Sequence, residues 1–290
     1  MDENEKILNA YIIESHKNMS SYGKKLILNS NFRDISSLMN NGSFIHLNWI
    51  KRIKSYLNLI LEYIIFKNVI FNNPFIKKYR IICSKQKRLF NNDFIIHSIF
   101  LEILQKKNIL SGNVCVIGDG STYFLSGVLD EKKISKIYSV NLPQSLIQDY
   151  LIIKKSNLID TKLIKVVNNK DDLLDKDIKL FLIPAQNKDF LLKQNINLFV
   201  NAFAFQEMPL EETKRYLEIV ESNSAYIYSI NREEKDMLDG NIIKYKDYGF
   251  KKNKIIFHEE ASFVKKFYNG NFPFIHQKKK KVLHTLALLN

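Results

Sequence analysis

The sequence predicts an α/β fold, a doubly wound and mostly parallel sheet with a helical extension at its N-terminus. From about residue 110 onward, short apolar runs that favour strands alternate with segments of helical periodicity. Before that point the chain has the pattern of helices throughout. We therefore expect a helical N-terminal region over residues 1–105 and the sheet domain over residues 106–290.

The clearest helical pattern of the N-terminal region begins at Trp49, where apolar residues recur at i, i+3, i+4 and i+7 as far as Ile64. A second apolar segment runs from Phe94 to Leu104 and stops before Ser111-Gly112. Because the apolar faces of these helices must be covered, we expect them to pack on the sheet domain and to roof its active site.

The first expected strand, residues 114–117, runs into a turn that contains Gly118 and Gly120. Glycine lets the backbone turn tightly and approach a ligand, and a helix after the turn directs unpaired N–H groups at it. Tyr123 holds the third place of a G-x-G-x-x-G pattern, so only two of its glycines are present. The turn predicts a nucleotide-like cofactor site at Gly118, Asp119, Gly120 and Ser121; an ordinary strand-to-helix turn is the alternative.

The second expected strand, residues 137–140, ends at Asn141-Leu142, 21 positions after Gly120. In dinucleotide-type folds a residue at this distance binds the ribose hydroxyls, and it is usually acidic. An amide also offers a donor and an acceptor, without the charge of a carboxylate. We expect Asn141 and Leu142 to contact the cofactor; a turn asparagine before Pro143 is the alternative.

Two segments compete for the next strand, residues 163–167 and residues 178–183, and the sequence does not choose between them. The choice matters for the cofactor, because Gln186 approaches its adenine if the second segment is the third strand. Asn168 takes that role if the first segment is.

The remaining elements follow the same alternation. Pro143 opens a helix, as proline does at an early helical position. After the uncertain strand we expect a strand at 197–201, a helix at 210–220, a strand at 225–230, a strand-like segment at 254–257 and a terminal strand at 282–289.

Charge and cysteine content narrow the class of protein. The net charge is +14, yet only six of the 44 basic residues are arginine and the lysines are spread along the chain. We therefore expect no nucleic-acid partner, and we interpret residues 278–281 as the solvated start of the last strand. Cys83 and Cys115 lack metal-ligand spacing and are expected to be reduced structural thiols.

Membrane and metal signals are also weak. The most hydrophobic stretch, residues 57–71, is interrupted by Glu62 and Lys67, and the N-terminus lacks the apolar core of a signal peptide. We expect a cytoplasmic protein without membrane insertion. No Asp, Glu and His cluster has convincing metal spacing, so we expect a metal-independent enzyme. The sequence does not predict an oligomeric state.

Four segments of the sheet domain form a set of motifs. In chain order they are Ile117-Gly118-Asp119-Gly120, Asn141-Leu142-Pro143 with Gln148-Asp149-Tyr150-Leu151, Asn201 with Phe205-Gln206-Glu207-Met208-Pro209, and Tyr226-Ile227-Tyr228-Ser229-Ile230-Asn231-Arg232. Together they resemble the sugar O-methyltransferases of bacterial surface-polysaccharide clusters, within the class I S-adenosylmethionine-dependent methyltransferases. The glycine turn is shared by many proteins, whereas the last two segments are more specific. The resemblance covers residues 117–232.

The resemblance implies a Rossmann-like fold, S-adenosylmethionine as cofactor and a sugar or sugar-containing acceptor. It implies cofactor contacts from the glycine turn, Asn141, Leu142 and Gln186, together with the loop after the strand at 197–201, namely Asn201, Ala202 and Phe203. It implies acceptor contacts from Gln206, Asn231 and Arg232.

The chain departs from the family pattern at two acidic positions. Val116 stands where an acidic residue usually precedes the glycine turn, and Asn141 replaces the acidic residue after the second strand. Both changes remove negative charge near a cationic sulfonium. A catalytically weak or repurposed homologue is therefore an alternative.

In the implied reaction a sugar hydroxyl attacks the methyl group of the sulfonium, and the protein supplies alignment and desolvation. Glu207 is the first candidate for a base that takes the hydroxyl proton, although it could equally cap the following helix. His258 and His276 are further candidates. Arg232 suits a phosphate or carboxylate on the sugar, or a pairing with the glutamates that follow it.

Three rival classes remain. A nucleic-acid methyltransferase fits the charge, but the chain lacks the Asn/Asp-Pro-Pro-Tyr segment of many base methyltransferases. An NAD-dependent oxidoreductase is disfavoured by the missing third glycine. A partner protein that keeps the fold without turnover would be excluded only by cofactor binding.

Overall fold

The structure is a computed structural model that describes residues 1–17, 60–61, 63–88, 90–236, 242–250, 254–268, 275–277 and 280–290. Most of the helix expected between Trp49 and Ile64 lies outside these residues. Within the described part of the chain, no helix has the length and apolar character needed to cross a membrane.

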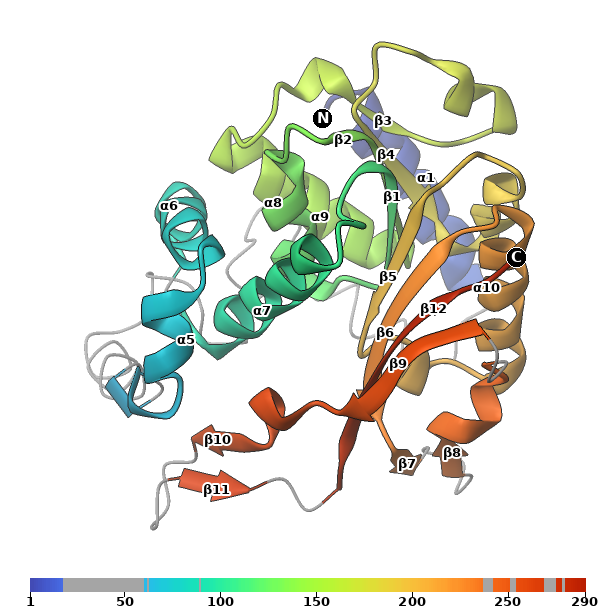
Figure 1. Cartoon of the computed structure of the whole chain (residues 1–290). Coiled ribbons are helices and arrows are strands. Elements are labelled where there is room, and N and C mark those ends of the chain that lie inside the picture. The colour runs from blue at the N-terminus through green and yellow to red at the C-terminus, as the bar shows by residue number, and fades with distance from the viewer. Residues whose placement is uncertain are drawn as a thin grey trace.

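An eight-stranded sheet forms the centre of the molecule, with the strand order β3-β4-β2-β1-β5-β6-β12-β9 (Figure 1). The strands are β1 Gly112–Ile117, β2 Ile134–Asn141, β3 Ile164–Val166, β4 Leu180–Pro184, β5 Leu198–Ala202, β6 Tyr226–Arg232, β9 Ile255–Glu260 and β12 Val282–Leu288. In this order, all neighbouring strands from β3 through β4, β2, β1 and β5 to β6 are parallel. Strand β12 is antiparallel to both of its neighbours, β6 and β9. This confirms the doubly wound, mostly parallel sheet.

Both candidates for the third strand form strands. The segment from Leu180 to Pro184 pairs directly with β2 and is the third strand from the centre, and β3 is added outside it as the edge. The sequence could not choose because both segments are strand-like and both lie on the same side of β2.

Helices cover both faces of the sheet. Helices α7, α8 and α9 lie on one side and α10 on the other (Figure 1). The α-helices are α1 Glu3–Lys17, α5 Lys67–Asn72, α6 Phe75–Gln86, α7 Asn92–Lys106, α8 Tyr123–Leu129, α9 Pro143–Ser156 and α10 Leu210–Ser222. The 3-10 segments are η1 Gly120–Thr122, η2 Thr161–Leu163, η3 Lys170–Leu174, η4 Ala185–Leu191, η5 Phe205–Glu207, η6 Tyr245–Tyr248 and η8 Ser262–Val264.

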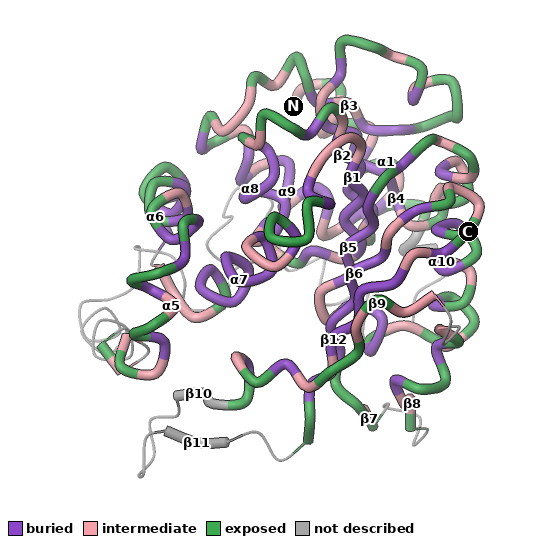
Figure 2. The backbone as a smooth tube through the Cα atoms, in the orientation of Figure 1, coloured by how far each residue is buried: buried purple, intermediate pink, exposed green. Residues whose placement is uncertain are grey.

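Strand β1 shows how the two faces arise. Val114 and Val116 belong to the hydrophobic cluster that includes α7, α8 and α9, whereas Cys115 and Ile117 belong to the cluster that includes α10. Side chains alternate between the faces of a strand, so a strand buried on both faces is apolar at every position. The central strands are buried along most of their length (Figure 2).

The N-terminal helices share the core of the sheet domain. Leu8 and Ile12 of α1, Tyr79 of α6 and Phe100 of α7 lie in the same buried cluster as β1. This confirms that α1, α6 and α7 pack on the sheet domain. The two cysteines are free and buried, as expected.

Two short hairpins complete the described elements. Strand β7 Glu234–Asp236 pairs with β8 Ile242–Lys244, and β10 Lys266–Tyr268 pairs with β11 Ile275–Gln277. Both hairpins lie beyond the end where β6 finishes (Figure 1).

Candidate functional site

The carboxyl ends of five neighbouring strands form one row. Ile117 at the end of β1 pairs with Val140 of β2 on one side and with Asn201 of β5 on the other. Asn141 in turn pairs with Pro184 of β4, and β6 follows β5 in parallel. At about 4.8 Å between strands, the row from β4 to β6 is about 19 Å long.

The chain changes direction between β1 and β5. From β1 the connection through α8 leads to β2 on one side, whereas β5 leads through α10 to β6 on the other. In open α/β sheets, ligands bind outside the carboxyl ends of the strands at such a topological switch point. The ends of β1 and β5 are therefore the centre of the candidate site.

The turn after β1 has a left-handed backbone at three positions. Gly118 has φ +67°, and a Cβ there would lie 2.3 Å from the Cβ of Ala204, so glycine is required. Ser121 and Thr122 are left-handed without being glycine, at φ 73° and 61°. Each such residue costs about 1–3 kcal/mol and persists only where its surroundings impose it. By contrast, a Cβ at Gly120 would meet nothing within 4 Å, so its backbone is open to a ligand.

The side chain of Asp119 points into the protein. It is 3% exposed, and its Oδ2 accepts a hydrogen bond from the Leu125 N–H at 2.6 Å. Burial raises the pKa of this carboxyl. The Asp119 side chain therefore accepts a hydrogen bond from an N–H of the first turn of α8. The Asp119 backbone, and not its side chain, borders the candidate site.

Asn141 and Leu142 lie at the end of β2, as expected. The Asn141 side chain makes contacts within the protein, whereas Leu142 is exposed. The Asn141 Oδ1 accepts a hydrogen bond from the Leu142 N–H at 2.9 Å, and its amide faces the buried carboxyl of Asp149. Leu142 is 60% exposed and presents an apolar surface beside the row. Burial raises the pKa of Asp149 well above its ordinary value, and the nearby Asp119 adds to the rise.

Gln186 is exposed at the start of η4, directly after β4. Because β4 is the third strand, Gln186 rather than Asn168 occupies the position expected beside an adenine. Asn168 is engaged elsewhere, since its Oδ1 accepts a 2.8 Å hydrogen bond from the Tyr11 hydroxyl of α1.

Asn201, Asn231 and Gln206 form a buried network at the ends of β5 and β6. The Asn231 Nδ2 donates to the Asn201 Oδ1 at 2.9 Å, and its Oδ1 accepts from the Gln206 N–H at 3.2 Å. The Gln206 Oε1 accepts from the Arg232 N–H at 2.9 Å. The three side chains are 0%, 0% and 4% exposed, so the network ties η5 to β6 from within.

Four further residues expected at the site are neighbours of that network in the chain, namely Ala202, Phe203, Glu207 and Arg232. Phe203 has φ +65°, a third strained residue at the carboxyl ends of the strands, and is partly exposed like Ala202. Glu207 is 56% exposed, forms an ion pair with Lys235, and accepts from the Gln206 Nε2 at 3.2 Å. Arg232 is exposed at the end of β6.

The other candidate bases lie apart from this centre. His258 is on β9, where its Nδ1 lies 2.7 Å from the Thr285 Oγ1 of β12. The side chain of His276 lies outside the described residues. Among the described residues, no three His, Cys, Asp or Glu side chains form a group that could hold a metal ion.

Arg88 is a residue of the site that the sequence reasoning did not find. It is 3% exposed, and its Nη1 donates to the Ser121 carbonyl at 2.7 Å. The one signal in the sequence is its type, because it is one of six arginines in a chain whose basic residues are otherwise lysine.

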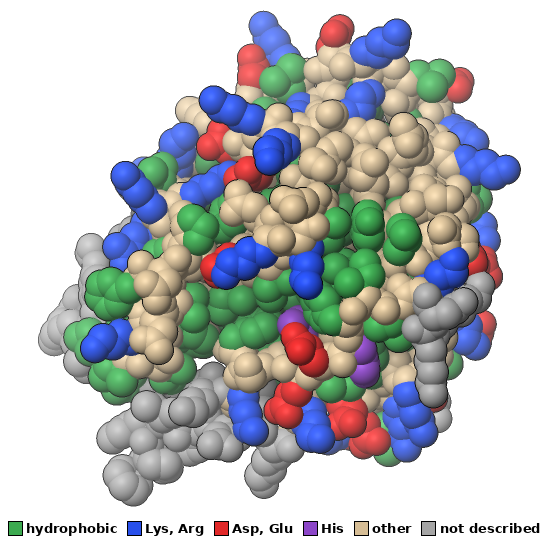
Figure 3. Space-filling view, in the orientation of Figure 1, with side chains coloured by type: hydrophobic (Ala, Val, Ile, Leu, Met, Phe, Trp, Pro, Cys, Tyr) green, Lys and Arg blue, Asp and Glu red, His purple; other side chains and the backbone are tan. Residues whose placement is uncertain are grey.

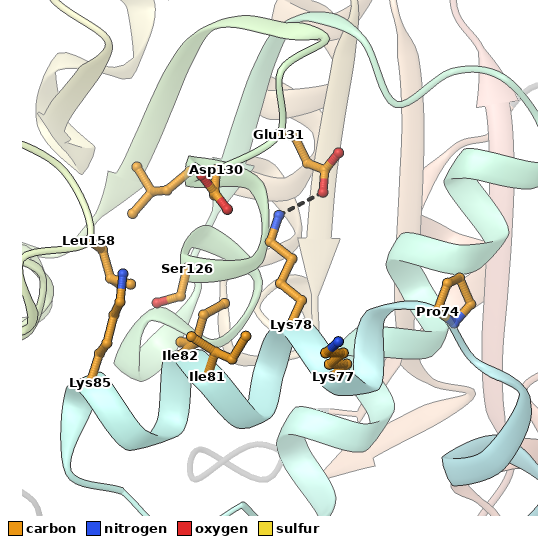
Figure 4. Close-up of a pocket in the computed structure, with 11 residues that line it drawn as sticks. Pro74, Lys77, Lys78, Ile81, Ile82, Lys85, Ser126, Asp130, Glu131 and Leu158 are labelled. Atoms are coloured by element: carbon orange, nitrogen blue, oxygen red, sulfur yellow. Dashed lines mark hydrogen bonds and ion pairs between the residues drawn. The ribbon is translucent and has the colours of Figure 1, made fainter.

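A separate pocket of 420 Å³ lies between α6, α8 and Leu158, away from the row of strand ends (Figure 4). Lys77, Lys78 and Lys85 stand on its α6 side, and Lys78 forms a 2.6 Å ion pair with Glu131 across it. Basic side chains are scattered over the face in Figure 3, with acidic ones between them and an apolar band across the middle.

No family model and no curated protein matches the chain. Among solved structures, the chain is similar to an S-adenosylmethionine-dependent methyltransferase from Aquifex aeolicus, with 15% identity, 65% of this chain and 89% of that chain covered, and a TM-score of 0.41. It is similar to the methyltransferase domain of bacterial CtHen1, with 10% identity, 66% and 97% covered, and a TM-score of 0.40. It is also similar to TYW2 from M. jannaschii in complex with AdoMet, with 14% identity, 70% and 78% covered, and a TM-score of 0.37.

Proposed function

We propose that the protein is an S-adenosylmethionine-dependent methyltransferase. The observation that carries the proposal is the left-handed glycine turn at the topological switch point, which leaves the Gly120 backbone open next to the ends of β2 and β5. Close backbone approach to a nucleotide-like cofactor is the use that such a turn has in α/β sheets.

The exposed groups along the row fit the cofactor's adenosine. The open backbone at Gly120 and Ser121, the apolar surface of Leu142 and the amide of Gln186 would hold it from the β1, β2 and β4 side. Ala202 and Phe203 border it from β5. The cofactor supplies the methyl group, and these residues bind and orient it.

The ionisable side chains near the turn indicate a low affinity for the positive charge of the sulfonium. Asn141 is neutral, and burial raises the pKa of both Asp119 and Asp149, which favours their uncharged forms. The affinity for the sulfonium should therefore be close to that for the neutral thioether product, because Asn141 carries no charge that would favour the sulfonium.

The acceptor that we propose is a sugar hydroxyl, in a cytoplasmic step of bacterial surface-polysaccharide synthesis. This rests on the resemblance of residues 205–209 and 226–232, which Gln206 links to one another at the site. Glu207 and Arg232 are the exposed charged groups of these segments. Glu207 would take the hydroxyl proton after leaving Lys235, and Arg232 would bind an acidic group of the sugar. Gln206 and Asn231 would shape the acceptor site from beneath.

Calorimetric titration of the purified protein with S-adenosylmethionine, S-adenosylhomocysteine and NAD tests the cofactor. We expect micromolar binding of the first two, with similar affinities, and no binding of NAD. Binding of NAD alone would instead favour an oxidoreductase. Absence of all binding, with and without a sugar-acceptor mixture, would leave a partner protein without turnover as the better account.

Transfer of a labelled methyl group tests the acceptor and the base. Nucleotide-sugars and lipid-linked oligosaccharides should accept label, whereas RNA should not. Glu207→Gln should lower kcat at least about 100-fold with little change in cofactor affinity. Glu211→Gln is the matched control, because Glu211 is an exposed glutamate at the start of α10. Label in RNA alone would overturn the sugar proposal in favour of a nucleic-acid methyltransferase.

A further inference from the structure

Arg88 reaches the candidate site from the N-terminal helical region. Helix α6 ends at Gln86, and Lys87 takes a left-handed conformation with φ 53°. The Arg88 N–H then donates to the Cys83 carbonyl at 2.9 Å, which closes the end of the helix. This turn directs a buried guanidinium toward the loop between β1 and α8.

The guanidinium is held on three sides. Its Nη1 donates to the Ser121 carbonyl at 2.7 Å. Its Cζ lies 4.3 Å from the centre of the Tyr123 ring and 4.7 Å from that of Phe94, and these two rings meet edge to face. A cation within this distance of two aromatic rings is stabilised by each of them. The loop carbonyl is therefore bonded to a side chain that has little freedom to move.

Two further contacts fasten α6, one to α8, the helix that follows the loop, and one to the turn after α8. The Gln86 Nε2 donates to the Ser126 Oγ at 2.8 Å. Near the other end of α6, the ion pair of Lys78 with Glu131 spans the pocket in Figure 4. Because these contacts hold α6 in place, they also fix the position of Arg88 relative to the loop.

The loop that Arg88 holds is the strained one. Ser121, whose carbonyl it binds, is left-handed, and so is the next residue, Thr122. Non-glycine residues keep this conformation only where surrounding contacts impose it. The guanidinium also lies near the buried Asp119 and Asp149, where its charge opposes the effect of burial on both carboxyls.

We propose that Arg88 is a positioning residue, which holds the left-handed loop at residues 120–122 in the conformation that binds the cofactor. Through it, the N-terminal helices set the cofactor affinity of the sheet domain. The effect on cofactor affinity rests on the proposed function, whereas the effect on the loop conformation does not.

Arg88→Ala and Arg88→Lys test the proposal, with Arg80→Ala as the matched control. Arg80 is on α6 itself and, like Arg88, lies over two rings, those of Tyr63 and Phe90, but it is exposed and away from the loop. We would measure hydrogen exchange over residues 120–125 and calorimetric affinity for S-adenosylhomocysteine, on protein shown to be folded by thermal unfolding.

In Arg88→Ala we expect exchange over residues 120–125 to be at least 10-fold faster and the Kd at least 10-fold higher. Arg88→Lys keeps the charge without the planar fork, so it should lie between Arg88→Ala and wild type. It is also the variant to rely on if Arg88→Ala does not fold. Arg80→Ala should match the wild type in both measurements.

Unchanged exchange in both Arg88 variants would overturn the hold on the loop. Faster exchange with wild-type affinity would overturn the positioning role, because the loop would be held for stability alone. If the wild-type protein binds no S-adenosylhomocysteine, the proposed function fails and with it the link to cofactor affinity. The exchange rates alone then decide whether Arg88 holds the loop.

Discussion

Two carboxyl groups, those of Asp119 and Asp149, lie buried beneath the glycine turn, and they have different hydrogen-bonding neighbours. Asp119 accepts a short hydrogen bond from the Leu125 N–H, and Asp149 is 0% exposed beside Asn141. Burial is the largest cause of the raised pKa in both. A buried carboxyl with a raised pKa takes up a proton more readily in the folded state than in the unfolded chain, which makes stability depend on pH.

Asp149→Asn should therefore stabilise the protein, and more so at pH 7 than at pH 4. The unfolded carboxyl ionises from its ordinary pKa of 3.8, while the folded one keeps its proton to higher pH, so the wild type loses stability as pH rises through this interval. The free energy of unfolding in urea should be higher for the variant than for the wild type at pH 7, and this difference should shrink at pH 4. Asp177→Asn, at an exposed position, is the control. A difference that is the same at both pH values would refute this.

Asn231→Leu should destabilise the protein by about 2–3 kcal/mol, measured by urea unfolding. The leucine removes the acceptor of the Gln206 N–H and one of the two donors to the Asn201 Oδ1, and both groups are buried. Gln105→Leu, on the exposed face of α7, should change stability by less than about 0.5 kcal/mol. Equal effects of the two substitutions would show that the network adds nothing to stability.

At the scale of residues, sequence reasoning placed the strand ends better than it placed the side chains. It placed Gly118, Asn141 and Gln186 at the strand ends, where they are found. It did not foresee that Asp119 points inward or that the Asn141 Oδ1 accepts from its neighbour, because side-chain direction depends on tertiary packing. Arg88 was missed because it lies 33 residues from Ser121 in the sequence.

At the scale of elements, α1 protects the edge of the sheet. Asn4 bonds to the backbone of the edge strand β3 twice, since its Nδ2 donates to the Ile164 carbonyl at 3.1 Å and its Oδ1 accepts from the Val166 N–H at 3.0 Å. Lys154 of α9 holds the start of the helix through Asp2 and Glu5. A covered edge strand offers no free backbone groups to another chain.

Asn4→Ala should lower the free energy of unfolding by about 1–2 kcal/mol, because two hydrogen bonds to the edge strand are lost. Hydrogen exchange at the Val166 amide should rise in parallel. Asn9→Ala is the control on the same helix, where the asparagine contacts only the Met1 Sδ among the described hydrogen bonds. Wild-type exchange at Val166 in the Asn4 variant would show that α1 does not protect the edge.

The elements after residue 110 were predictable because their apolar runs are local and sharply bounded. The strands at β1, β2, β5 and β6 and the helices α9 and α10 all lie where periodicity placed them. The order of β3 and β4 was not predictable, since strand pairing is a long-range choice between two similar segments. The hydrogen bonds of α1 to the backbone of β3 come from the side chain of Asn4, which no periodicity reveals.

At the scale of the molecule, two hydrophobic layers hold a sheet whose strand ends form one open row. The N-terminal helices are part of that arrangement, because α1 covers the edge strand and Arg88 bonds to the glycine turn. The same packing that buries the sheet thus fixes the strained turn. We propose that this turn binds S-adenosylmethionine through the open backbone at Gly120.

Calorimetric titration of Gly120→Val with S-adenosylhomocysteine tests that claim most directly. A Cβ at this position meets nothing within 4 Å, so we expect the variant to keep the wild-type Tm. Ser111→Val, just before β1 at the opposite end of the strand, is the control. We predict at least a 10-fold weaker affinity for Gly120→Val at unchanged Tm, with wild-type affinity for the control. Wild-type affinity in Gly120→Val would contradict the claim, because no ligand would then approach the turn.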